Sequence, residues 1–369
     1  MGFSCGIVGL PNVGKSTLFN ALLEQQQAEA ANYPFCTIEP NVGRVAVPDE
    51  RLQHIAHIAK SKEILPTQLE FVDIAGLVRG ASKGEGLGNQ FLSHIREVDA
   101  IVYMLRCFED DDITHVEGSV DPLRDWEIIE TELILADLES LEKRKTALEK
   151  RKRGNDKEAT LLLPFVERGI ELASQGNALR PLLAEAADAE ERKLVNMLNL
   201  LTTKPVMVVC NVDEESAAEG NSISEKVKAH CAKHQVAFVV ISAKIEEEIA
   251  ALESAEDKQE FLDTLGLKRT GLANIIVEGY KLLDLLTFFT AGPKEARAWT
   301  VWKGAKAPQA AGRIHTDFEK GFIRAETIAY DDYIELHGEQ GAKDAGKMRL
   351  EGKDYIVKDG DIFHFRFNV

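Results

Sequence analysis

Short apolar runs recur before residue 110 and after residue 205, and segments with helical spacing separate them. Apolar runs of this length, bounded by turn signals, are typical of buried parallel strands. The expected strands cover residues 3–8, 42–47, 68–72, 100–106, 205–210 and 236–241. Strands that alternate with helices in this way predict an α/β fold with a doubly wound, mainly parallel sheet.

The pattern becomes purely helical between residues 126 and 201. Apolar positions there step by three and four residues in two series, with one lysine breaking the first: Ile134, Leu138, Leu141, Lys145 and Leu148, then Leu163, Val166, Ile170 and Ala173. Two such helices on either side of the basic segment 151–155 predict an antiparallel coiled-coil hairpin. A third helix is expected near residues 185–201.

From about residue 285 the chain has more aromatic residues and glycines, arranged in short alternating runs. This change predicts a small α+β module at the end of the chain. The expected domains are a split α/β domain (1–125 and 202–284), an inserted helical domain (126–201) and a terminal module (285–369). A further helix, over residues 50–60, is expected within the first domain.

Composition narrows the class of protein. Hydrophobic residues make up 44% of the chain and charged residues 28%, which is ordinary for a globular protein. No apolar run is long enough to span a bilayer, and no secretory signal precedes the first strand. The five cysteines show no C-x-x-C spacing, so a reduced, cytoplasmic protein without zinc is expected. A net charge of −17 argues against a protein that coats nucleic acid with its whole surface.

Residues 9–17 contain the eight-residue pattern G-x-x-x-x-G-K-[ST] between an expected strand and an expected helix. This P-loop predicts a nucleoside triphosphate site, because backbone N–H groups and the helix N-terminus attract phosphate oxygens. Lys15 would reach the β- and γ-phosphates, and Ser16 would bind Mg²⁺. A chance glycine-rich turn is the alternative. The predicted phosphate-binding residues are Asn12, Val13, Gly14, Lys15, Ser16 and Thr17.

Further motifs follow at strand ends: Asp73-Ile74-Ala75-Gly76, Asn211-Val212-Asp213-Glu214 and Ser242-Ala243-Lys244. Together with residues 32–37 and 312–318, they make the whole chain resemble the YchF/Obg-like ATPase family, a branch of the Obg-related GTPases. The last segment resembles a TGS domain, which is a β-grasp module. The resemblance implies a P-loop hydrolase of acid anhydrides that works with the translation apparatus.

The loop and D-x-x-G motifs suggest a nucleotide-controlled switch. The Thr37 hydroxyl would bind Mg²⁺, Asp73 would hold a Mg²⁺-bound water, and the Gly76 N–H would sense the γ-phosphate. For Thr37 alone, an ordinary turn hydrogen bond is the alternative. Asn12 is at a position that binds K⁺ in potassium-activated relatives, but it could equally be a turn residue.

Base recognition departs from the N-K-x-D motif of GTPases, because Val212 replaces the lysine and Glu214 the aspartate. The Ala243 N–H, next to Ser242, would donate to adenine N1. Asn211 and Glu214 would face the N6 amino group, and Phe108 and Val212 would pack on the base. A site built for one hydrogen-bond pattern can reject the other. ATP is therefore expected to bind more tightly than GTP. An Obg-type GTPase in ribosome assembly or translation is the alternative, and a nucleotide-binding module without productive hydrolysis is a third.

Leu77 follows the D-x-x-G motif, where GTPases often have a glutamine that orients the attacking water. Leucine cannot orient water, so another group must do so or hydrolysis stays slow. The family resemblance offers His115 as the catalytic residue. A lone histidine in a polar loop is otherwise most often only solvated.

The expected hairpin tip is basic on an acidic protein, with seven cations against Glu142 and Glu149. The cations are Lys143, Arg144, Lys145, Lys150, Arg151, Lys152 and Arg153. The terminal module adds Arg313, His315, Lys320 and Arg324 near Phe318 and Phe322. The tip suits rRNA, the terminal patch suits RNA or a ribosomal protein, and the family resemblance implies the ribosome. A solvated helix face is the alternative reading of the tip. Neither a membrane nor sequence-specific DNA is an expected partner.

Overall fold

The computed structural model describes residues 3–30, 41–74, 87–110, 112–252 and 254–368. The described residues form two six-stranded sheets. The first sheet has the strand order β2-β4-β1-β5-β6-β7. Its strands are β1 (Ser4–Val8), β2 (Val42–Ala46), β4 (Gln68–Asp73), β5 (Ala100–Arg106), β6 (Val206–Asn211) and β7 (Ala237–Ile241). All neighbours are parallel except β2 and β4, which confirms the predicted α/β class.

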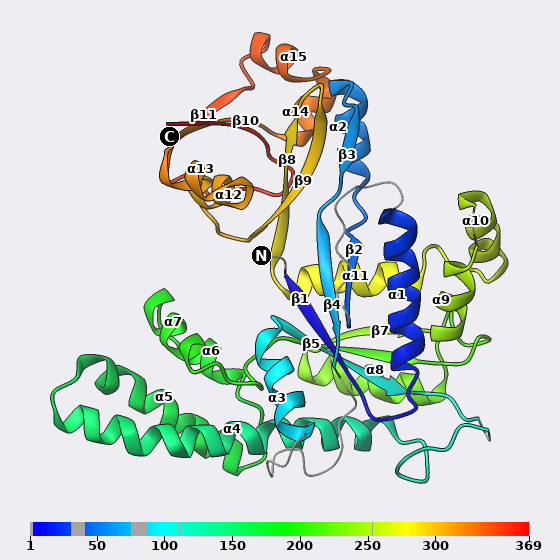
Figure 1. Cartoon of the computed structure of the whole chain (residues 1–369), viewed down its shortest axis with the longest axis vertical. Helices are drawn as coiled ribbons and strands as arrows, with labels where there is room; N and C mark the ends of the chain where they lie inside the picture. The colour runs from blue at the N-terminus through cyan, green and yellow to red at the C-terminus, as the bar shows by residue number, and fades with distance from the viewer. Residues whose placement is uncertain (1–2, 31–40, 75–86, 111, 253, 369) are drawn as a thin grey trace.

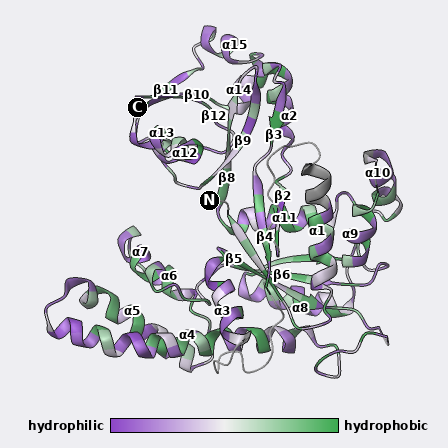
Figure 2. Ribbon diagram, viewed as in Figure 1, coloured by the Kyte–Doolittle hydropathy of each residue, from purple (hydrophilic) through white to green (hydrophobic). Residues whose placement is uncertain are grey.

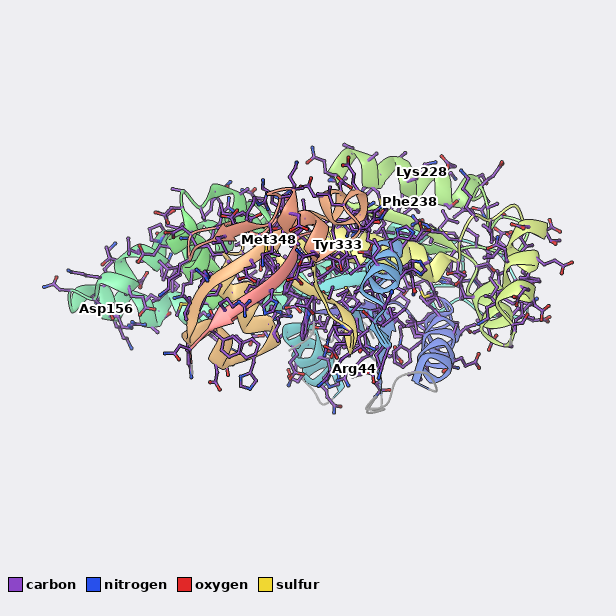
Figure 3. The ribbon with its side chains drawn as sticks, turned by 90° about the horizontal axis from the view of Figure 1, so that it is seen from above. Arg44, Asp156, Lys228, Phe238, Tyr333 and Met348 are labelled. Atoms are coloured by element: carbon purple, nitrogen blue, oxygen red, sulfur yellow. The ribbon has the colours of Figure 1, made fainter. Side chains whose placement is uncertain are left out.

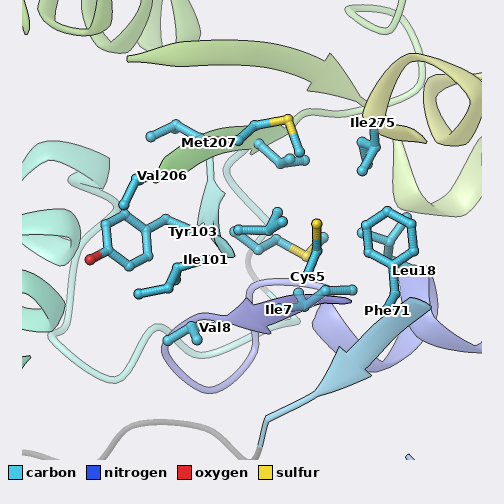
Figure 4. Close-up of a cluster of buried hydrophobic side chains, with 14 of the residues drawn as sticks. Cys5, Ile7, Val8, Leu18, Phe71, Ile101, Tyr103, Val206, Met207 and Ile275 are labelled. Atoms are coloured by element: carbon cyan, nitrogen blue, oxygen red, sulfur yellow. The ribbon is translucent and has the colours of Figure 1, made fainter. Parts of the chain in front are cut away.

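Helices cover both faces of the first sheet (Figure 1). On one face, α1 (Lys15–Ala30) and α11 (Gly271–Leu282) pack on the strands, and Cys5, Leu18 and Phe71 are fully buried between them (Figure 4). The other face carries α3 (Leu87–Glu97), α8 (Ser222–His234) and the first turns of α4 (Pro122–Arg153). Burial on both faces explains why the strands read as continuous apolar runs. All seven residues of β5, for example, are buried.

The predicted helical hairpin is present. Helix α4 contains 32 residues, which makes it about 48 Å long, and it packs along α5 (Lys157–Ser174). Figure 1 shows both helices projecting from the first sheet, and Asp156 at their turn lies at one end of the molecule in Figure 3. Asn155, with a φ of 59°, makes the tight turn between them.

The third helix, predicted near residues 185–201, is the shorter α7 (Ala189–Met197), and another short helix, α6 (Pro181–Glu185), precedes it. The Asp188 side chain accepts hydrogen bonds from the backbone at the start of α7, so the helix begins there. The segment after α7 is held against α4 by the buried Asp137 carboxylate. It accepts from the N–H groups of Leu201 and Thr202, both at 2.8 Å.

The second sheet has the order β11-β10-β12-β8-β9-β3. Its strands are β3 (Glu63–Leu65), β8 (Leu285–Ala291), β9 (Glu295–Trp302), β10 (Phe322–Ile328), β11 (Arg349–Glu351) and β12 (Ile362–Phe367). Helices α12 (Ala307–Ile314) and α13 (Thr316–Lys320) adjoin one core, whereas α14 (Tyr330–Glu335) and α15 (Glu339–Asp344) adjoin another. In Figure 2 hydrophobic residues gather in the strands of the first sheet, and hydrophilic residues predominate on α7 and α15.

Part of the expected first domain belongs structurally with the second sheet. Helix α2 (Glu50–Ala59) buries Leu52 and Ile55 against the second sheet, and β3 pairs in parallel with β9. The sequence placed residues 50–65 with the first domain, because nothing in their local pattern distinguishes one sheet from the other. The connection from β2 to β4 is therefore a long excursion into the C-terminal module.

Two more helices, α9 (Ala243–Ala250) and α10 (Ala255–Thr264), precede α11. None of the helices in the described ranges is long and apolar enough to cross a membrane.

Candidate functional site

A cavity of about 900 Å³ opens where β1, β5, β6 and β7 end. Ligands of open α/β sheets bind at the carboxyl ends of the strands, where the strand order reverses. Most of the residues predicted to bind nucleotide line this cavity: Asn12, Gly14, Lys15, Ser16, Thr17, Phe108, Asn211, Val212, Glu214, Ser242 and Ala243. Val13 is instead buried beneath it, with 1% of its surface exposed.

The P-loop turns tightly between β1 and α1. Asn12 and Gly14 have φ values of 64° and 92°, so the backbone adopts left-handed conformations at both. Asn12 therefore lies in a tight turn, and its side-chain amide donates to the Thr114 carbonyl at 3.1 Å. The turn brings the start of α1 to the cavity, where helix N–H groups favour an anion.

Lys15 and Asp73 contact each other directly as an ion pair in which both side chains are largely buried. Asp73 ends β4 beside the P-loop, so its carboxylate is close to the lysine and to the start of α1. At this position the lysine can also donate to phosphate oxygens, and the carboxylate can also accept from the water shell of a divalent cation. Hydroxyl and carboxylate oxygens are the ligands Mg²⁺ prefers, so this donor set fits the ion.

The Asn211 side chain links the P-loop to the segment that follows β7. Its Nδ2 donates to the Val13 carbonyl, and its Oδ1 accepts from the Ala243 N–H, both at 2.9 Å. Asn211 is 4% exposed, so these are buried hydrogen bonds. This geometry corrects the prediction for Ala243. Its N–H is already donated to Asn211 and is not directed at adenine N1.

Glu214 forms an ion pair with Lys244 at the mouth of the cavity. The hydrogen bond from Lys244 holds the pKa of the Glu214 carboxyl below its usual range. Glu214 therefore remains an anion that can accept further hydrogen bonds. Two apolar residues of the predicted base pocket, Val212 and Ala243, are 2% exposed and form a buried surface beside it.

Arg106 is a site residue that the sequence analysis missed. It ends β5 and is 1% exposed, and its guanidinium carbon lies 4.6 Å from the centroid of the Phe108 ring. A charged residue closing an apolar strand was the available signal. Its hydrogen bonds hold the loop after β5, which forms one wall of the cavity.

His115 does not line the cavity. Its Nε2 is 2.9 Å from Asp125 Oδ2, and its Nδ1 accepts from the Glu117 N–H at 3.1 Å. Since Nδ1 accepts, the proton of the neutral ring is assigned to Nε2, which donates to Asp125. Burial raises the pKa of Asp125, and the His115 bond opposes that rise. Both ring nitrogens are engaged away from the cavity, so this geometry does not support the predicted catalytic role.

Replacing His115 by alanine is accordingly expected to lower the free energy of unfolding by about 1–3 kcal/mol, because the buried Asp125 carboxylate loses one of its two side-chain donors and keeps only Arg124. Urea unfolding measures this loss. The matched variant Asp125→Asn keeps an oxygen that can accept from Nε2 and should cost less. A His115→Ala protein of unchanged stability whose turnover has collapsed would restore the catalytic assignment.

Thr37, Gly76 and Leu77 lie outside the described residues. Their predicted roles in binding Mg²⁺, in sensing the γ-phosphate and in keeping hydrolysis slow therefore remain predictions. Cys36 lies there too, whereas the other four cysteines are free thiols and buried: Cys5, Cys107, Cys210 and Cys231.

Two segments of the chain match models of known protein families. A family model described as 50S ribosome-binding GTPase matches residues 4–126. The YchF-GTPase_C model, described as a protein of unknown function (DUF933), matches residues 285–368. Proteins called ribosome-binding ATPase YchF from Haemophilus influenzae and Bacillus subtilis are 57% and 54% identical, over 100% of each chain. The solved structure of the Schizosaccharomyces pombe YchF GTPase is 39% identical with a TM-score of 0.86, covering 99% of this chain and 98% of that one.

Proposed function

Because the chain belongs to the YchF family, we propose that it is a nucleotide-dependent switch that hydrolyses ATP to ADP and phosphate and associates with the ribosome. The observation that carries the proposal is the cavity. It is lined both by the P-loop and by Val212 and Glu214, the two positions at which the base-recognition motif differs from that of GTPases. The names of the full-length relatives support both the ATPase activity and the ribosomal partner. Association with the ribosome would place the protein in the cytoplasm.

Lys15 would hold the β- and γ-phosphates, exchanging its contact with Asp73 for phosphate oxygens. Mg²⁺, with Ser16 and Thr37 as protein ligands and Asp73 acting through water, would neutralise phosphate charge. The Gly76 N–H would contact the γ-phosphate. Leucine at position 77 has no polar group to orient the attacking water, and His115 is engaged by Asp125. A low intrinsic rate of hydrolysis follows from that arrangement.

Glu214 would discriminate adenine from guanine at position 6 of the base. Adenine has an amino donor there, whereas guanine has a carbonyl acceptor that a carboxylate repels. Asn211 supports this side of the base pocket through its hydrogen bonds to Val13 and Ala243. Phe108 and Val212 would pack on the base.

Calorimetric titration of the nucleotide-free protein with ATP and GTP analogues in Mg²⁺ buffer tests the proposed base preference. ATP is expected to bind at least tenfold more tightly, which corresponds to about 1.4 kcal/mol. Lys15→Ala should weaken both analogues alike, because it removes a phosphate contact and not a base contact. Tenfold tighter binding of GTP would reject the ATP preference and favour an Obg-type GTPase. Turnover in KCl against NaCl tests the separate proposal that Asn12 helps to bind K⁺.

The hairpin tip is the proposed rRNA contact. Lys150, Lys152 and Arg153 are exposed, and they take part in no ion pair among the described residues, whereas Arg151 is paired with Asp156 and Glu158. In the C-terminal module, Lys320 and Arg324 are exposed. Arg313 is instead half-buried, with its guanidinium carbon 4.8 Å from the Phe3 ring centroid, so it belongs to the junction with the first sheet.

Changing Lys150, Lys152 and Arg153 to glutamate is expected to weaken ribosome association at least tenfold at low salt. The difference should shrink as salt rises, because phosphate contacts are screened. Cosedimentation with purified ribosomes over a salt series measures it. The matched control changes three exposed lysines of α8, Lys226, Lys228 and Lys233, and so alters the net charge equally. Equal losses for both variants would mean that total charge, and not the tip, governs association.

A further inference from the structure

Arg106 makes an unusual set of contacts for a buried charge. Its Nε donates to the Phe108 carbonyl at 3.1 Å, Nη1 to the Ile113 carbonyl at 2.8 Å and Nη2 to the Asp110 carbonyl at 3.2 Å. Every acceptor is a backbone carbonyl of the loop that follows β5. A guanidinium presents its donors in a fixed planar fork, so three carbonyls bound to it are fixed relative to one another.

The same guanidinium stacks on the Phe108 ring, which lines the cavity. Arg106 therefore determines both the path of the loop and the place of its aromatic side chain. A second tether, from Asn12 to the Thr114 carbonyl, joins the far part of this loop to the P-loop. The described part of the loop, residues 107–110 and 112–121, contains several exposed charged residues and no helix or strand, so local propensity alone does not define its conformation.

We propose that Arg106 is a positioning residue for the nucleobase: it holds Phe108 as a preformed stacking surface and thereby sets the share of nucleotide affinity that comes from the base. The inference rests on the proposed function, because it takes the cavity to be a nucleotide site. A preorganised aromatic surface adds affinity because the loop does not have to be ordered when the ligand binds. The base is a flat π-system, for which a ring in a fixed position is the appropriate partner.

Two probes separate the base contribution from the phosphate contribution: a non-hydrolysable ATP analogue and inorganic tripolyphosphate, which has no base. Arg106→Met removes the three donors and the charge while keeping a long side chain. We expect it to weaken the ATP analogue at least tenfold and to change tripolyphosphate affinity less than twofold. Arg106→Lys, which keeps the charge but not the fork, should give an intermediate loss.

A double-mutant cycle with Phe108→Ala tests whether Arg106 acts through the ring. If it does, the double variant binds the ATP analogue no more weakly than the weaker single variant. Arg313→Met is the matched control, since Arg313 also stacks on an aromatic ring and donates to a backbone carbonyl, that of Thr300 at 2.9 Å, but at the module junction. It should leave the difference between the two probes unchanged.

Equal weakening of both probes by Arg106→Met, additive losses in the cycle, or an unchanged ATP analogue would each overturn the inference. If urea unfolding shows that the Arg106→Met protein is not folded, the cycle is completed with Arg106→Lys, to which the same criteria apply. Failure of the proposed function is recognised separately in the unaltered protein. If that protein prefers GTP, the cycle is repeated with the GTP analogue, because the role of Arg106 concerns the stacking surface for either purine.

Discussion

Gly14→Ala is expected to weaken ATP binding more than a hundredfold. Gly14 has a φ of 92°, and an added Cβ would lie 2.3 Å from Asn211 Nδ2. The Asn211 side chain cannot simply rotate away, because it is buried and bonded to both Val13 and Ala243. Losing those bonds costs about 1–3 kcal/mol each, and left-handed strain adds about 1–2 kcal/mol. A P-loop that relieves the clash by moving no longer presents its N–H groups to phosphate.

Gly176→Ala is the matched control for this clash. Gly176 has a φ of 76°, and an added Cβ there would meet nothing within 4 Å. It carries the same kind of backbone strain in a turn after α5, far from the cavity. Both variants should lose some stability, but only Gly14→Ala should lose ATP binding in calorimetry. Comparable ATP affinity in the two variants would show that Asn211 yields easily and does not fix the P-loop.

The fold and the location of the site followed from the sequence because they depend on local patterns. Strands buried on both faces leave continuous apolar runs, and the ends of parallel strands meet at one edge of a sheet. Motifs at four of those ends therefore had to converge. The helical hairpin was equally predictable, since its apolar period continues on both sides of the turn at Asn155.

What the sequence could not give depends on partners distant in the chain. The Ala243 N–H was assigned to a base because its bond to Asn211, which is 32 residues away, leaves no trace in the local pattern. Likewise, nothing near His115 showed that Asp125 engages its ring. Strand β3 has three residues, the first of them exposed, so no alternation revealed that it completes the second sheet.

Phe289→Ala is expected to detach α2 from the C-terminal module. Phe289 and its neighbour Phe288 on β8 are both fully buried, but they point to opposite faces of the second sheet. Phe289 packs in the cluster that contains Leu52 and Ile55 of α2, whereas Phe288 packs in the core beside α12. Each truncation should cost about 3–5 kcal/mol of unfolding free energy.

The two variants should differ in where the structure loosens. Hydrogen exchange over residues 50–65 should accelerate strongly in Phe289→Ala and much less in Phe288→Ala, because only the first removes an anchor of α2. Arg51 reinforces that anchor through its 2.6 Å bond to Asp359 and its position over the Phe289 ring. Similar exchange over residues 50–65 in both variants would mean that the β3–β9 pairing alone holds this segment.

Residues 50–65 also affect the nucleotide cavity, because they connect β2 to β4, and β4 ends at Asp73 beside Lys15. The C-terminal module is thus joined to the cavity through the antiparallel β2–β4 pair, in addition to the direct connection from α11 to β8. Detaching α2 should therefore also make the end of β4 at Asp73 more mobile. An ATP affinity that falls in Phe289→Ala and not in Phe288→Ala would identify the β2–β4 pair as the connection between nucleotide and module. Equal affinities would place that connection elsewhere.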